Sequence, residues 1–102
     1  MQGCATISSA VYDIVTKLGG INDTYTIDDV AATLADRAPK LETWSQINGD
    51  GGNLKASKWL LGMSENARRL RVALESLDAD GITKFGGDLA AGTGEISDFC
   101  PN

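Results

Sequence analysis

The sequence predicts a mainly α-helical domain with a small C-terminal β-ribbon. Apolar residues recur at the 3.6-residue spacing of a helix through most of the first 78 residues. The segment 81–99 is rich in glycine, and its apolar ends are typical of two short strands joined by a loose tip. The chain of 102 residues has the size of one domain, and no linker divides it. We therefore expect a single domain over residues 1–102.

The N-terminal part of this domain, residues 8–47, is expected to be helical. Ser8 or Ser9 can cap a first helix, and the glycine pair 19–20 can end it, because glycine readily adopts the left-handed conformation found past helix ends. Thr26 can cap the next helix. Two aspartates in its first turn would face the positive end of the helix dipole.

The middle of the chain contains two helix-breaking signals. Pro39 should end the second helix and begin a short third one over residues 40–47. The stretch NGDGGN, residues 48–53, lacks the oxygen ligands, glycine and glutamate at the spacing of a calcium-binding loop, so a flexible turn is expected there. Trp44 and Trp59 are expected in the core, because a small domain needs the large apolar area that each can bury.

Residues 54–80 are expected to form a helix-turn-helix-like pair. The first helix would span residues 54–61 and end at Gly62. Ser64 would cap the second helix, residues 64–78, whose alanines and leucines repeat at helical spacing. The wing-like ribbon of residues 81–99 would follow.

Positive charge is concentrated in one stretch of an acidic protein whose formal net charge is −5. Residues 1–54 carry a net charge of −4 and residues 72–102 one of −5, whereas residues 55–71 carry +4. The overall acidity argues against nonspecific coating of nucleic acid, but the basic island at 55–71 indicates one local anion-binding surface.

The usual signatures of catalysis are absent from the sequence. There is no histidine, which removes the commonest general base and the usual partner of a nucleophilic serine or cysteine. The glycines match neither a phosphate-binding loop nor a dinucleotide fingerprint. We therefore expect no enzymatic activity, no cofactor and no metal site.

The two cysteines, Cys4 and Cys100, stand near opposite ends of the chain. No apolar run approaches the ~20 residues needed to cross a bilayer, and the N-terminus lacks the pattern of a signal peptide. A disulfide between the termini is an alternative, but two reduced thiols and a cytoplasmic location are predicted.

Residues 54–96 resemble the second half of winged helix-turn-helix proteins. The similarity lies in WLLGMS, a helix ended by glycine with a capping serine, and in ENARRLRVALESLDADGI, where two leucines pack inward and Gly81 would release the chain into the wing. The resemblance implies a recognition helix, residues 64–78, in the DNA major groove and a wing that touches the DNA backbone or minor groove.

The function implied is a sequence-specific DNA-binding transcriptional regulator that acts as a dimer. Arginine suits phosphates and the two major-groove acceptors of guanine. The predicted DNA-binding residues are Lys55, Lys58, Ser64, Asn66, Arg68, Arg69, Arg71 and Lys84. The alternative for the arginines is a solvated face, with Arg68 paired to Glu65 and Arg71 to Glu75 at helical spacing.

A second function fits the size and acidity equally well. It is a small acidic inhibitor of the phage-encoded type, for example an anti-CRISPR, that binds and blocks a protein partner. The location of the basic island favours DNA, because a binder of basic protein surfaces has no evident use for it.

Overall fold

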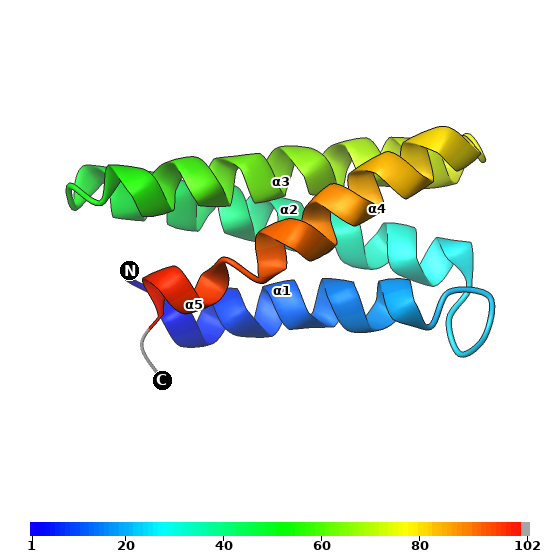
Figure 1. Ribbon diagram of the computed structural model, residues 1–102, viewed down its shortest axis with the longest axis horizontal. Coiled ribbons are helices and arrows are strands. Elements are labelled where there is room, and N and C mark those ends of the chain that lie inside the picture. The colour runs from blue at the N-terminus through cyan, green and yellow to red at the C-terminus, as the bar shows by residue number, and fades with distance from the viewer. Residues whose placement is uncertain (101–102) are drawn as a thin grey trace.

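The computed structural model describes residues 1–100 and consists of five α-helices (Figure 1). In chain order they are α1 (Cys4–Gly19), α2 (Ile27–Asp50), α3 (Leu54–Glu75), α4 (Ala79–Thr93) and the single turn α5 (Ile96–Phe99). No β-sheet occurs within this part of the chain, so the predicted mainly α fold with a C-terminal β-ribbon is wrong in its β component.

The helices enclose one hydrophobic core. Packing runs from α1 to α2, from α2 to α3, from α3 to α4 and from α4 back to α1. Figure 1 shows α2 and α3 as a long antiparallel hairpin, with α4 crossing obliquely between α3 and α1 and with the N-terminus and α5 at one end of the bundle. The largest fully buried side chains are Ile7, Ile14, Leu34, Leu41, Leu60, Leu70, Leu74 and Leu89. Trp59 is buried as predicted, and Trp44 packs half-buried against the core.

The first helix starts a full turn before the predicted serine cap. Its N-cap is Gly3, which has a φ of 81° and no side chain with which to cap. A Cβ at Gly3 would lie 2.5 Å from Cε3 of Trp44, so the bare backbone approaches the indole ring here. The additional turn allows Ile7 to be buried completely. Gly20 follows the end of α1, in agreement with the glycine pair predicted there.

The second helix begins as predicted but does not stop at Pro39. Thr26 accepts a hydrogen bond from the Asp29 backbone N–H, and the Asp29 carboxylate accepts one from Thr26 N–H, which completes a capping box. Pro39 lies inside α2 and is exposed. Its neighbours Ala38 and Leu41 are buried. Their burial offsets the backbone hydrogen bond that proline cannot make, so α2 continues to Asp50.

The predicted helix-turn-helix pair is one uninterrupted helix, α3. Gly62 lies within it, and a Cβ there would meet nothing within 4 Å. Ser64 is no cap, because it is fully buried and its hydroxyl donates to the Ala38 carbonyl at 2.8 Å. The helix continues because apolar residues on both sides of Gly62, such as Leu60 and Leu70, are buried in the same core. One glycine costs only about 1 kcal/mol of helix propensity.

The predicted wing, residues 81–99, forms α4 and α5 instead. Asp78 caps α4 by accepting a hydrogen bond from Gly81 N–H at 3.2 Å. Leu77, with a φ of 54°, takes the left-handed conformation expected of Gly81. Apolar side chains at Ile82, Phe85 and Leu89 follow helical spacing and pack on the core. Their burial outweighs the low helix propensity of the glycines between them.

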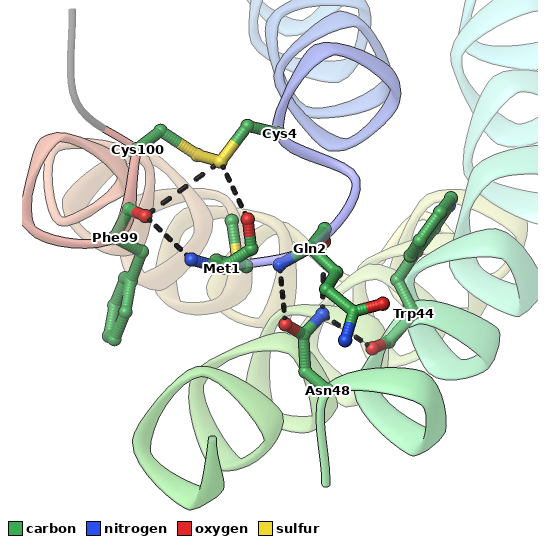
Figure 2. The surroundings of a disulfide bond; sticks show 7 residues. All are labelled: Met1, Gln2, Cys4, Trp44, Asn48, Phe99 and Cys100. Carbon is green, nitrogen blue, oxygen red and sulfur yellow. Dashed lines mark hydrogen bonds between the residues drawn. A yellow bond between two sulfur atoms is a disulfide. The ribbon is translucent and has the colours of Figure 1, made fainter. Parts of the chain in front are cut away.

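The cysteines are paired, which corrects the prediction of two reduced thiols. Cys4 at the start of α1 and Cys100 after α5 form a disulfide with 5.7 Å between their Cα atoms (Figure 2). The Met1 ammonium also donates to the Phe99 carbonyl at 3.2 Å, so two links hold α5 against the N-terminus. The dashed lines in Figure 2 from the Cys4 sulfur to the carbonyl oxygens of Met1 and Phe99 are hydrogen bonds only for a thiol, because a disulfide sulfur carries no hydrogen.

A second polar cluster holds the N-terminus against α2. The Asn48 side chain is buried, accepts from Gln2 N–H at 2.8 Å and donates to the carbonyl oxygens of Gln2 and Trp44 (Figure 2). These bonds use both hydrogens of the buried amide and give its oxygen a donor. No helix in residues 1–100 is both long and apolar enough to cross a bilayer.

Candidate functional site

The predicted DNA-binding residues do not form one continuous positive surface. Arg68 forms an ion pair with Glu42 of α2, and Arg71 pairs with Glu75 at 2.8 Å along α3. Of the two pairs in the alternative to DNA contact, Arg71–Glu75 is present, whereas Arg68 is directed across to Glu42 of α2 rather than to Glu65 of its own helix. Half of each of these side chains is exposed, so the pairs contribute little to stability.

Lys55, Lys58 and Arg69 make no ion pair with any residue between 1 and 100. The two lysines line a hollow of about 580 Å³ that also includes Glu95 and Asp98 of the C-terminal segment. These two carboxylates face the lysines and reduce the positive potential at this end of α3.

Three other residues predicted to contact DNA are either partly or fully buried or lie on a different helix. Ser64 is buried between α3 and α2, where no external ligand can reach it. Asn66 is half-buried. Lys84 belongs to α4, and its ammonium lies 5.5 Å from the ring centre of Phe85. The resemblance placed Lys84 in a wing that residues 81–99 do not form.

The most prominent surface feature is apolar. Five large hydrophobic side chains are exposed in the described part of the chain, and four of them lie on α3 or in the turn after it. These are Leu54, Leu61, Val72 and Leu77, with exposed fractions of 72%, 42%, 64% and 72%. Such side chains are unremarkable when scattered, but their concentration along one element makes α3 the candidate binding surface of the described chain.

Three of these residues share one face of α3. Leu61 follows Leu54 by seven residues, and Val72 follows Leu61 by eleven, which correspond to about two and three helical turns. Charged residues of both signs occupy the same face between and beyond them. We call this face the α3 stripe, which consists of Leu54, Lys58, Leu61, Glu65, Arg68, Val72 and Glu75.

A shallow groove of about 300 Å³ borders the stripe where α3 meets α4. Val72 and Phe85 supply its apolar wall, and Arg68, Arg69 and Asp78 surround it. The groove extends the apolar surface of the stripe sideways, so a partner lying on α3 can also contact α4.

The other charged cluster has a structural role. Arg37 of α2 bonds Asp13 of α1 at 3.0 Å and also pairs with Asp36. The Asp13 and Asp36 carboxylates raise the pKa of Arg37, and hydrogen bonds from Lys40 and Arg37 hold the pKa of Asp36 below its ordinary value. This cluster links α1 to α2. Within residues 1–100 no group of histidine, cysteine or carboxylate side chains is arranged to hold a metal ion.

The stripe could not be predicted from a sequence pattern in which Gly62 divides residues 54–75 into two helices. When residues 54–75 are taken as one helix, Leu54, Leu61 and Val72 fall opposite the buried set that includes Leu60, Leu70 and Leu74. Apolar residues on both sides of a helix would have been a usable signal. Comparisons with protein-family models, with curated proteins and with solved structures gave no match to this chain.

Proposed function

We propose that this protein acts by binding another protein through the α3 stripe. Of the two functions predicted from the sequence, this proposal keeps the second, which is binding to a protein partner. It does not name that partner. The observation that carries it is the concentration of exposed Leu54, Leu61 and Val72 on one solvent-facing side of a long helix. A straight helix that presents apolar residues at intervals of two and three turns is suited to lie against a helix or groove of similar length.

The charges of the stripe favour a protein partner that carries its own charged groups over a partner whose surface is purely apolar. Lys58, Glu65, Arg68 and Glu75 alternate in sign along the helix and border the apolar positions. Such a border is typical of the polar rim around the apolar centre of a protein interface, where it selects the partner and its register.

The disulfide supports an oxidising compartment in place of the predicted cytoplasm, because cytosolic thiols are kept reduced. Thiol titration of protein that is isolated without reductant and then unfolded would test this. We expect no free thiol, and two titratable thiols would restore the cytoplasmic location.

Photo-crosslinking in the source cells tests the proposed function. A benzophenone amino acid at position 72, an exposed apolar position near the C-terminal end of the α3 stripe, should form protein adducts. The same group at Thr16, exposed on α1, is the control and should form none. Adducts should disappear when Leu61→Glu is added to the crosslinker at 72, while helicity and Tm stay unchanged. Equal crosslinking from both positions, or none from 72, would exclude this surface.

Binding of duplex DNA is a second candidate, supported by Lys55, Lys58 and Arg69 of α3, which form no ion pair with any residue between 1 and 100. It would proceed by phosphate contact without a helix-turn-helix. Affinity should fall steeply with salt, because each neutralised phosphate releases counterions. The triple variant Lys55→Glu, Lys58→Glu, Arg69→Glu should lose binding. Absence of duplex binding at low salt would eliminate this candidate.

A further inference from the structure

We propose that the α3 stripe binds a second copy of this chain, with the two α3 helices antiparallel about a two-fold axis that passes between residues 66 and 67. This inference rests on the proposed function, since it names the partner of the same surface. It is carried by the order of apolar and charged residues along the stripe, which is complementary to itself in that one register.

In a two-fold antiparallel pair, each residue faces the one equally distant from the axis on the other side. Leu61 then faces Val72 of the partner subunit, and both side chains are exposed in the single chain. Glu65 faces Arg68 of the partner subunit, next to Arg69, and Lys58 faces Glu75 of the partner subunit. Every contact occurs twice, so two apolar pairs would be surrounded by four oppositely charged pairs.

Two of these charged side chains are already held in place within the single chain. Arg68 is anchored by Glu42 of α2, and Glu75 is held by Arg71 at 2.8 Å. Association therefore costs less side-chain entropy than it would for free side chains. Arg68 has several guanidinium donors and can bond a second carboxylate while it keeps the first.

Neighbouring registers are disfavoured by like charges. A register centred on residue 65 places Glu65 against Glu65 of the partner subunit. A register that pairs Leu54 with Val72 is centred on residue 63, and it places Lys58 opposite Arg68. Like charges directly opposed at an interface disfavour association, so the charges of the stripe select the register centred between residues 66 and 67.

The size of the contact sets the expected strength. The paired segment from Lys58 to Glu75 is about 26 Å long at 1.5 Å per residue, and it is one helix wide. Such a strip buries less than the ~1,200 Å² of standard complexes, which places the dimer among weak, reversible associations. The dimer should therefore form at high local concentration rather than as an obligate assembly.

Sedimentation velocity over a concentration series tests the dimer with the full oxidised chain. The average mass should rise from 10.7 kDa toward twice that value as concentration increases. Glu65→Arg alone and Arg68→Glu alone should each weaken self-association by about tenfold or more, because each opposes like charges twice. An equimolar mixture of the two variants should associate again, since each positive pair then faces a negative pair.

Lys40→Glu on α2 and Asp88→Lys on α4, two exposed positions, form the control. They make the same changes of charge away from the stripe, so neither alone nor mixed should they alter association. Circular dichroism and Tm of every variant would show whether each still folds. If Arg68→Glu unfolds, the variants Lys58→Glu and Glu75→Lys test the same charge reversal at the second charged contact of the dimer. Each alone should weaken association, and their mixture should recover it.

The outcomes separate this inference from the proposed function. A protein that stays monomeric at millimolar concentration, or single variants that do not recover on mixing, would overturn the dimer. If the crosslinker at position 72 then captures a different protein, binding by the α3 stripe stands with another partner. A crosslinked dimer together with recovery on mixing supports both.

Discussion

The α2–α3 hairpin and the C-terminal segment, α4 with α5, are both helical but are stabilised in different ways. The hairpin helices begin at side-chain caps, Thr26 for α2 and Asn53 for α3. Buried hydroxyls join them, with Ser45 donating to the Ser57 carbonyl at 2.7 Å and Ser64 to the Ala38 carbonyl at 2.8 Å. Local capping and interhelical hydrogen bonds therefore act together in the hairpin.

The C-terminal segment also begins at a side-chain cap, Asp78, but it depends more on distant contacts. Five glycines lie between residues 79 and 99, and each lowers helix propensity by up to about 1 kcal/mol relative to alanine. Buried Leu89 and Ile96 attach the segment to the core, and Trp59 donates its indole N–H to the Gly92 carbonyl at 2.9 Å. The disulfide then closes its end. A sequence that forms a helix poorly by itself is thus kept helical by tertiary contacts.

The largest expected effect comes from removing the disulfide. Cys4→Ser with Cys100→Ser should lower the free energy of unfolding by about 2 to 4 kcal/mol, because the link closes nearly the whole chain. Urea unfolding would measure this loss. Native-state hydrogen exchange should accelerate most in α5 and the end of α4, because these parts then open locally. Amides of α2 and α3 should still exchange only through global unfolding of the protein. Uniform acceleration would show that the two regions do not differ.

The next effect concerns the close approach of α4 to α3. A Cβ at Gly92 would lie 2.5 Å from the sulfur of buried Met63. Gly92→Ala should cost about 2 kcal/mol by overpacking and regain about 1 kcal/mol in helix propensity, a net loss of about 1 kcal/mol. Gly87→Ala is the matched control on the same helix, since nothing lies within 4 Å of its Cβ position, and it should stabilise. Equal thermal stability of the two variants would contradict close packing at residue 92.

An effect of opposite sign is expected at Gly62 of the hairpin. Gly62→Ala should raise the free energy of unfolding by about 0.5 to 1 kcal/mol, because the residue is helical and its Cβ meets open space. Thermal or urea unfolding would detect the shift. In a helix-turn-helix with a left-handed glycine, the same substitution would lower the free energy of unfolding. A destabilised variant would therefore indicate a turn between two helices at Gly62.

The smallest effect is acid weakening around α2. The Thr26 N–H and hydroxyl hold the pKa of Asp29 below its ordinary value, and Lys40 with Arg37 does the same for Asp36. Carboxyls with lowered pKa in the folded state stabilise it above their unfolded pKa, about 3.9, and lose this contribution as pH falls through the folded value. Asp29→Asn and Asp36→Asn should each flatten the decline of Tm below pH 4. If Tm of both variants falls below pH 4 as steeply as that of the unmodified protein, other titratable groups cause the decline.

The sequence by itself determined the local features of the hairpin side. The helical repeat of α1, the glycines after it, the capping box at Thr26 and the Arg71–Glu75 pair each depend on residues within about one turn of one another. Interactions of that range are readable from spacing, because they form whenever the helix forms.

Only the tertiary structure decided that Pro39, Gly62 and the glycines of α4 lie inside helices and that Cys4 meets Cys100. The proline and each of these glycines lower helix stability by about 1 to 3 kcal/mol. Burial of leucines against distant helices stabilises the protein by more than this. The α3 stripe follows from the same cause. The solvent face of α3 is defined only once α2 and α4 cover its other sides, and that depends on contacts between residues far apart in the chain.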